Sequence, residues 1–413
     1  MLEFRINDFI TLKFEDDKTN IYILGEEFIQ CKYLLMNVPI QDIERYNEMN
    51  SIDEASEKLD KTLERGNPEA FKINIPFKVE FWGHCSNLQV WAEQDYDTCF
   101  IHSNLAFPLL KKLTEVEDLR ARKIFKDEIG KRFEMGPDSV RQFLTLEGYM
   151  DFLSRDEMWS VMPNQSEVKI LQTIERETGA EFKLCSNKME ELTWGEELNQ
   201  LAFSIEGDNV LEIDLLNFRT LPTLKWKKIF ALLGKLSALR WLFLTHNNLK
   251  TIPEGVRGVK SLEVLKLNHN DLEELPEAIG DLGKLVWLIL NDNKIRKLPK
   301  SIGKLRLLKE LRLDHNQLIE LPNTIGNLKS IEKLFLNNNR LKILPDGIIG
   351  MDSLSQLILG CNFLLDLPEK MIEMKSLKGI SLEDNKKIKK NSLVIASLEK
   401  KGVYIRMKKK KII

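Results

Sequence analysis

Apolar residues recur at a fixed interval of 23 positions from Leu239 onward, through six uninterrupted copies that end at residue 376. The first copy reads LRWLFLTHNNLKTIPEGVRGVKS and the third reads LVWLILNDNKIRKLPKSIGKLRL. In each copy the run L-x-x-L-x-L places two leucines at alternate positions, which predicts a short strand with one face in the core. Strands from successive copies would lie about 4.8 Å apart in one parallel sheet. One copy cannot bury its own apolar face, so the copies are expected to stack into a curved solenoid.

One asparagine stands at the same position of every copy, shortly after the predicted strand. Its side-chain amide can satisfy backbone groups in the following bend that no neighbouring strand reaches. We interpret this column as a structural ladder rather than a reactive site. The ladder residues are Asn247, Asn270, Asn293, Asn316, Asn339 and Asn362.

Two segments with a different pattern flank the repeats (239–376), as the ends of a solenoid require. Residues 164–238 are expected to form a connecting helix, a hairpin that turns at GDN and an irregular first repeat. Residues 377–413 are expected to form a C-terminal cap and a basic tail, RMKKKKII. We interpret the tail mainly as solvated, with contact to an acidic protein surface, anionic lipid or nucleic acid as alternatives.

The N-terminal part shows other periodicities. Residues 1–40 contain about three short apolar runs between turn signals, which predicts a β segment. Residues 41–163 contain runs with i, i+3, i+4 spacing, which predict paired helices in a HEAT-like or armadillo-like layer. Four capping patterns precede apolar runs and begin at Ser51, Ser86, Thr114 and Asn164. The predicted fold class is thus an α/β repeat solenoid with an N-terminal α+β, mostly helical domain.

The repeat form LxxLxLxxNxLxxLPxxIgxLxx resembles the Ras-group leucine-rich repeat family of intracellular proteins. In the N-terminal half, FWGHCSNLQ and HSNLAFPLLKKLTEV are similar to a region that precedes such repeats in archaeal, notably Asgard-type, proteins. The resemblance implies a leucine-rich-repeat solenoid that serves as a protein-binding scaffold in signalling. The partner that it implies is a small GTPase or another regulatory protein.

Alternate strand positions point away from the core and would line the concave face of the solenoid. Several of them hold large apolar or basic side chains where the pattern calls for solvent-exposed residues, and such side chains dominate protein interfaces. An alternative for the first two is that the chain's own N-terminal half covers them. The candidate partner-binding residues are Trp241, Phe243, Lys266, Trp287, Ile289, Arg312 and Phe335.

Residues 81–104 hold two of the five histidines and two of the five cysteines of the chain. His84, Cys85, Cys99 and His102 offer the nitrogen and sulfur ligands that zinc prefers. Adjacent residues such as His84 and Cys85 do not converge easily on one ion, and no C-x-x-C pair is present. Ser86 is expected to cap a helix, so His84 and Cys85 would lead into it. We therefore favour a structural role, with a metal site or a Cys–His nucleophile as alternatives.

One repeat position holds three histidines and an aspartate in successive copies, which raises a second metal hypothesis. The same position accepts asparagine and cysteine in later copies, so we interpret it as a tolerant polar position beside the asparagine column. The residues are His246, His269, Asp292, His315, Asn338 and Cys361.

Composition narrows the class of protein. The hydrophobic content of 43% is typical of globular proteins, and five scattered cysteines do not form a disulfide framework. No apolar run approaches the roughly 20 residues of a membrane helix, and no signal-peptide pattern is present, so we expect a cytoplasmic protein. The first 200 residues hold 39 acidic and 24 basic residues, and the remainder holds 24 acidic and 37 basic residues. Nucleic acid stays a distant alternative because the concave columns mix basic residues with glutamates.

The sequence lacks the common catalytic motifs. There is no G-x-x-x-x-G-K-[ST] loop, no H-E-x-x-H and no G-x-S-x-G. We therefore predict an adaptor without enzymatic activity or cofactor, with a monomer favoured. The main alternative is a metal-binding or enzymatic N-terminal domain that the repeats direct to a target.

Overall fold

The computed structural model describes residues 2–29, 76–101, 103–185, 200–388 and 392–407. The chain forms two compact units, which we describe separately. The N-terminal unit comprises residues 1–136 and 149–158, and the repeat unit comprises residues 137–148 and 159–413. The expected helix cap at Ser51 and the basic tail beyond Met407 lie outside the described residues.

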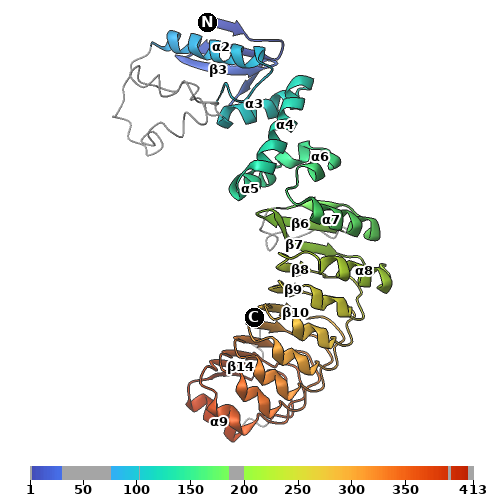
Figure 1. Cartoon of the computed structure of the whole chain (residues 1–413). Coiled ribbons are helices and arrows are strands. Elements are labelled where there is room, and N and C mark those ends of the chain that lie inside the picture. Colours follow the sequence, from blue (N-terminus) through green and yellow to red (C-terminus); the bar gives the residue numbers. More distant parts are fainter. Residues whose placement is uncertain (1, 30–75, 102, 186–199, 389–391, 408–413) are drawn as a thin grey trace, which may run out of the picture. The chain divides into compact units, whose positions relative to one another are not determined.

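The N-terminal unit begins with a four-stranded antiparallel sheet in the order β1-β2-β3-β4 (Figure 1). Its strands are β1 (Leu2–Arg5), β2 (Ile10–Glu15), β3 (Lys18–Ile23) and β4 (Glu26–Phe28). The turn between β2 and β3 uses two aspartates with positive φ, Asp16 and Asp17, as a tight hairpin with right-handed strand twist requires. Helix α2 (Phe77–Glu93) packs on this sheet, and the rings of Phe14 and Phe81 lie 5.9 Å apart.

Three further helical segments of this unit are α3 (Ser103–Glu115), α4 (Leu119–Met135) and η3 (Tyr149–Phe152). The cap of α4 is Asp118, whose Oδ1 accepts hydrogen bonds from the amides of Arg120 and Ala121. The expected cap Thr114 instead lies in the last turn of α3, because Val116 and Glu117 continue the backbone bonding to Lys112 and Thr114. Helices α3 and α4 pack as a pair, whereas α2 lies on a sheet, so the HEAT-like assignment stays a prediction.

The chain changes unit after residues 136, 148 and 158, the last of these within α6 (Arg155–Ser160). The repeat unit therefore includes α5 (Asp138–Leu146). Helix α7 (Gln165–Thr178) begins at its expected cap, Asn164, which accepts from the amide of Glu167. Strand β5 (Phe182–Leu184) then pairs with the antiparallel hairpin of β6 (Gln200–Glu206) and β7 (Asn209–Leu216). Helix α8 (Thr223–Leu233) follows this hairpin and packs beside α7.

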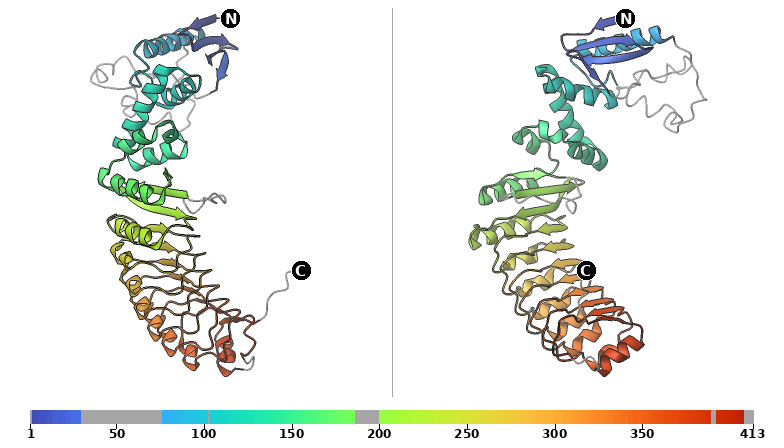
Figure 2. Two further views of the ribbon diagram at one scale, coloured as in Figure 1. Left: turned by 90° about the vertical axis from the view of Figure 1, so that its right-hand side faces the viewer. Right: turned by 180° about the vertical axis from the view of Figure 1, so that it is seen from behind.

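The repeats complete an eleven-stranded sheet in the order β15 to β5, in which every pair from β7 to β15 is parallel (Figure 1). The strands are β8 (Trp241–Phe243), β9 (Val264–Lys266), β10 (Trp287–Ile289), β11 (Glu310–Arg312), β12 (Lys333–Phe335), β13 (Gln356–Ile358), β14 (Gly379–Ser381) and β15 (Tyr404–Arg406). The stacked strands line the inner side of the arc of the repeat unit, and helical segments line its outer side (Figure 2).

The outer segments are short 3-10 helices, each preceded by the proline of its repeat. They are η5 (Glu254–Gly258), η6 (Glu277–Asp281), η7 (Lys300–Lys304), η8 (Asn323–Asn327), η9 (Asp346–Gly350) and η10 (Glu369–Glu373), and α9 (Leu393–Lys400) follows. Glycine lets them stack closely, since a Cβ at Gly303 would lie 2.2 Å from the carbonyl oxygen of Thr324. Between the two layers, leucines such as Leu288 and Leu311 are fully buried.

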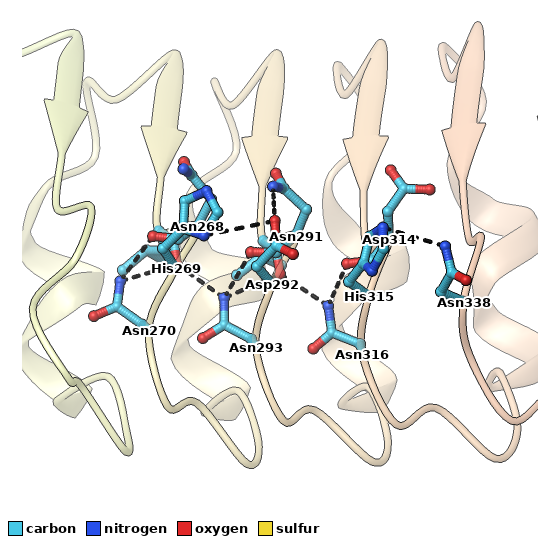
Figure 3. A network of polar contacts seen from close by, with 12 residues as sticks. Asn268, His269, Asn270, Asn291, Asp292, Asn293, Asp314, His315, Asn316 and Asn338 are labelled. Atoms are coloured by element: carbon cyan, nitrogen blue, oxygen red, sulfur yellow. Dashed lines mark hydrogen bonds and ion pairs between the residues drawn. The ribbon is translucent and has the colours of Figure 1, made fainter.

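The ladder asparagines tie each repeat to its neighbours (Figure 3). The Asn293 Nδ2 group donates to the carbonyl oxygens of Leu267 at 2.9 Å and Leu290 at 3.0 Å. Its Oδ1 atom accepts from the amide of Leu272 at 3.0 Å. Asn270, Asn316 and the later members repeat these bonds, and Asn385 extends the ladder beyond the six copies.

Candidate functional site

The middle residue of each repeat strand faces the core, and the first and third residues face the inner side of the arc. In β10, Leu288 is fully buried, whereas Trp287 is 38% exposed and Ile289 is half-buried. The same alternation holds in β11 to β13. We call the central inner residues Trp287, Ile289, Arg312, Phe335 and Ile358 the concave patch.

Pairing between strands holds the concave patch together. The parallel register places Ile289 beside Arg312, Arg312 beside Phe335, and Phe335 beside Ile358. The Arg312 guanidinium lies 4.8 Å from the centre of the Phe335 ring, a cation–π contact, and also bonds to Glu310. The patch is therefore a continuous surface that combines an indole, a phenyl ring, two isoleucines and a stacked guanidinium.

The structure corrects the expectation for the N-terminal end of this face. Phe243 is 6% exposed and packs with Ala202 and Val264, with Cys185 and Trp241 against them. The Lys266 ammonium lies over the Phe243 ring at 4.4 Å. Phe243 is thus a buried residue of the repeat unit, and the prediction that its ring is exposed on the concave face is wrong. The cover within the repeat unit comes from Ala202 of β6 and from Cys185 at the end of β5.

Ion pairs between neighbouring repeats neutralise much of the basic charge on the concave face. Arg240 bonds to Glu263 at 2.9 Å, Lys309 lies 3.6 Å from Glu332, and Arg406 pairs with Glu383. These three cations each have a carboxylate partner within the chain, which reduces the free basic charge that a phosphate backbone requires. This arrangement disfavours the nucleic-acid alternative for the concave face.

Two buried carboxylates close the N-terminal end of the concave face. Strand β7 places Glu212 beside Trp241 and Asp214 beside Phe243 in register, so their side chains lie on the inner side. Glu212 is fully buried and accepts a hydrogen bond from Ser204, and Asp214 is 6% exposed. Within the described residues, Oδ1 of Asp214 has no hydrogen-bond partner. Burial raises the pKa of Asp214 to about 7, while the Lys266 charge opposes that rise.

We predict that Asp214→Asn stabilises the repeat unit at alkaline pH. Between about pH 4 and 7 the unfolded chain has released a proton that native Asp214 retains, so wild-type stability falls as pH rises through this range. The variant lacks this loss and should be more stable by on the order of 3 kcal/mol above pH 7. Urea unfolding at pH 4.5 and pH 8 measures both stabilities. An advantage of the variant that is equal at both pH values would contradict the assignment.

The structure places the histidine–cysteine stretch in the middle of a helix. His84 and Cys85 are buried within α2, and Ser86 is part of the same helix, so the expected cap at Ser86 is wrong. Burial lowers the pKa of His84 despite its contact with Glu80, and burial raises the pKa of Cys85 to about 11. Cys85 is therefore a protonated thiol at neutral pH, which does not suit a nucleophile.

The other two candidate zinc ligands, Cys99 and His102, do not form a described site with His84 and Cys85. Cys99 lies in the turn after α2, and burial raises the pKa of its thiol. His102 lies outside the described residues. Among the residues that the structure describes, no group of three histidine, cysteine or acidic side chains is arranged to hold a metal ion.

The row of histidines beside the ladder has a backbone explanation. His246, His269, Asp292 and His315 have positive φ angles between 55° and 57°, and Asn338 and Cys361 have positive φ angles of 51° and 53°. Histidine, asparagine and aspartate tolerate this left-handed region better than most residues. The His246 and His269 rings stack at 4.5 Å. His269 Nδ1 lies 3.7 Å from Asp292 (Figure 3). The repeat position is thus selected by its conformation.

The repeat unit has a second exposed apolar surface that the sequence pattern did not predict. On the edge of the repeat unit that follows the ladder, four apolar residues are more than half exposed: Ile319, Ile343, Phe363 and Leu365. Other repeats carry charged residues at these positions, for example Arg296 and Lys342, and this contrast is the sequence signal that could have found them. The same edge also forms an open groove.

A search of the described helices for one long and apolar enough to cross a membrane found none.

Comparisons with known families agree with the repeat architecture. Residues 201–317 match the model of a leucine-rich repeat region, and residues 307–328 match that of a leucine-rich repeat. The comparison with curated proteins found no match.

Several solved structures are similar to the chain. A leucine-rich-repeat protein of Leptospira interrogans shares 26% identity over 55% of this chain, with a TM-score of 0.37. The PEPR1–AtPEP1 crystal structure shares 28% identity over 43% of this chain, with a TM-score of 0.36. The ectodomain of the receptor kinase GASSHO1/SCHENGEN3 from Arabidopsis thaliana, in complex with CASPARIAN STRIP INTEGRITY FACTOR 2, shares 20% identity over 49%, with a TM-score of 0.38.

The chain spans 65%, 26% and 30% of the lengths of these three proteins, in that order. The matched residues, the parallel sheet and the asparagine ladder fall in the same part of the chain. Residues 201–328 therefore match leucine-rich repeat families, and the repeat unit has the leucine-rich repeat fold.

Proposed function

We propose that the concave patch binds a partner protein and that the chain acts as an adaptor. The observation that supports this proposal is Trp287, a tryptophan that is 38% exposed on a strand whose middle residue is fully buried. Ile289, Phe335 and Ile358 extend the apolar surface around it, and Arg312 adds a guanidinium that is already stacked on Phe335. Tryptophan and arginine are the residues most enriched in the energetic centres of protein interfaces.

The rigid architecture favours binding. The patch lies on strands that are tied together by the sheet and by the asparagine ladder, so few of its groups lose freedom when a partner docks. Association then costs less ordering free energy than it would on a flexible loop. Leucine-rich repeat proteins generally mediate protein–protein interaction, and their repeats are typically non-enzymatic binding modules.

The finer assignment rests on the sequence resemblance. A small GTPase or another regulatory protein is the partner class that the Ras-group repeat pattern implies, in a cytoplasmic signalling role. The absence of enzymatic activity in the whole chain stays a prediction, and it concerns the N-terminal unit most. The buried, protonated Cys85 thiol supports a structural role for that stretch.

The proposal is tested by affinity capture from native lysate with three baits: wild type, Trp287→Glu and Ile343→Glu. Ile343 is 62% exposed on the edge of the repeat unit, so its substitution controls for the loss of an exposed apolar residue outside the concave patch. We expect a protein that wild type and Ile343→Glu retain and Trp287→Glu loses, because a buried unpaired carboxylate at an interface centre is costly. The same set of captured proteins on all three baits would contradict the proposal.

A further inference from the structure

An open groove of about 730 Å³ runs along the edge of the repeat unit that follows the asparagine ladder. Each of the first four repeats contributes two adjacent residues to it, three and four positions beyond its ladder asparagine. The lining residues are Lys250, Thr251, Glu273, Glu274, Arg296, Lys297, Ile319 and Glu320. All eight are exposed.

The groove is a continuous row rather than a set of independent side chains. The amide of Glu273 donates to the carbonyl oxygen of Lys250 at 3.3 Å, that of Arg296 to Glu273 at 3.2 Å, and that of Ile319 to Arg296 at 3.2 Å. Backbone hydrogen bonds thus fix the order and the spacing of the four repeats along the groove. Successive pairs of side chains follow one another at about the 4.8 Å spacing of neighbouring strands.

The charges along this row have an antisymmetric order. The first repeat carries one positive charge on Lys250, the second two negative charges on Glu273 and Glu274, the third two positive charges on Arg296 and Lys297, and the fourth one negative charge on Glu320. Reading the row backwards gives the same magnitudes with every sign reversed. A two-fold axis between the second and third repeats would therefore place each charge opposite its complement on a second copy.

These charged side chains form no ion pairs with other described residues of the chain. None of the six charged side chains of the groove forms an ion pair or a side-chain hydrogen bond with another described residue, although the charge of Glu273 contributes to the raised pKa of Lys294. The concave face is different, because Arg240, Lys309 and Arg406 each pair with a glutamate. The groove thus presents opposite charges that remain available to a partner with the same spacing.

From this order we infer that a second copy of this chain docks on the groove in an antiparallel, two-fold arrangement. Glu273 and Glu274 of each copy face Arg296 and Lys297 of the other, and Lys250 faces Glu320. A two-fold contact uses the same surface on both copies, so its charge pattern must be self-complementary, and this pattern is. The inference does not rest on the proposed function, because no residue of the concave patch lines the groove. It departs from the expectation of a monomer.

The contact is made by exposed ion pairs, which are individually weak and are screened by salt. We therefore expect a dimer that is populated at high protein concentration and low ionic strength and that dissociates as salt is added. Sedimentation equilibrium of the full chain over a concentration series, in buffers of low and high ionic strength, measures this association.

Charge reversal tests the pairing itself. The variant Glu273→Arg/Glu274→Arg and the variant Arg296→Glu/Lys297→Glu should each lose at least about tenfold in self-association, because like charges then face each other. An equimolar mixture of the two should associate as a heterodimer. A single chain with all four substitutions should dimerise again, since the reversed row is still antisymmetric. Circular dichroism verifies that each variant is folded.

Trp287→Glu is the matched control and should dimerise like wild type, which separates this inference from the proposed function. Three results would each overturn the inference. The first is a wild-type protein that stays monomeric at the highest concentration in low salt. The second is a dimer that persists in the double-reversal variants. The third is a mixture of the two reversed variants that does not associate.

Discussion

Asn293→Ala is expected to lower the free energy of unfolding of the repeat unit by about 3–5 kcal/mol, the largest effect that we predict. The amide of Asn293 is the partner of two backbone carbonyls, those of Leu267 and Leu290, and of the Leu272 amide. All of these groups are buried at the bend. Alanine leaves the Leu272 amide without its acceptor. It also removes one of the two side-chain donors of each carbonyl, since Leu267 keeps only Asn270 and Leu290 keeps only Asn316. Urea unfolding monitored by circular dichroism measures the change.

Asn291→Ala is the matched control for this prediction. Asn291 lies two residues earlier in the same repeat, is partly exposed, and bonds through its side chain to Asp292. Its loss should cost less than about 1 kcal/mol, because water can replace its partner. Equal unfolding midpoints for Asn293→Ala and wild type would show that the asparagine ladder does not stabilise the solenoid.

Leu288→Ala is expected to destabilise the repeat unit by about 2–5 kcal/mol. Leu288 is fully buried, and the register places it between Leu265 and Leu311 of the neighbouring strands. Alanine leaves a cavity that rigidly stacked repeats on both sides cannot fill. Leu307→Ala, at a position that is 52% exposed, should change the stability by less than about 0.5 kcal/mol. A similar loss in both variants would contradict the assignment of Leu288 to the core.

The repeats could be predicted from the sequence because the same pattern of leucine and asparagine positions recurs in every copy. The period of 23 fixes which residues stack in a column, and from that the sheet, the inner side and the ladder follow. Trp287 could be assigned to the concave face in this way before any coordinates. No comparable repetition exists in the segments before the repeats, where single capping patterns at Ser86 and Thr114 were misleading and the one at Asn164 was right.

The backbone conformation explains why one repeat position holds histidine, aspartate, asparagine or cysteine. The sequence shows that one position accepts histidine, aspartate, asparagine and cysteine, which suggests tolerance of any polar residue. The structure shows a positive φ at that position in every repeat, for example 55° at His269 and 57° at Asp292. A periodic pattern reports which side chains share a column, but it does not report the backbone angle that selects them.

Burial at the ends of the repeats also could not be predicted from the periodic pattern. Phe243 occupies an inner position, so the pattern predicts exposure, yet Ala202 of the preceding hairpin packs against it. The buried Glu212 and Asp214 lie in the irregular first repeat, where the pattern is interrupted. Such contacts depend on a neighbouring element that belongs to no repeat, and only the tertiary structure places it.

The central claim is that the concave patch is the binding surface, and the affinity of the captured partner tests it most directly. We would titrate that protein against wild type, Trp287→Glu and Ile343→Glu by calorimetry at one salt concentration. The expected result is a loss of at least about a hundredfold in affinity for Trp287→Glu and less than about twofold for Ile343→Glu. Equal affinities for wild type and Trp287→Glu would contradict the claim and would place the binding surface elsewhere on the chain.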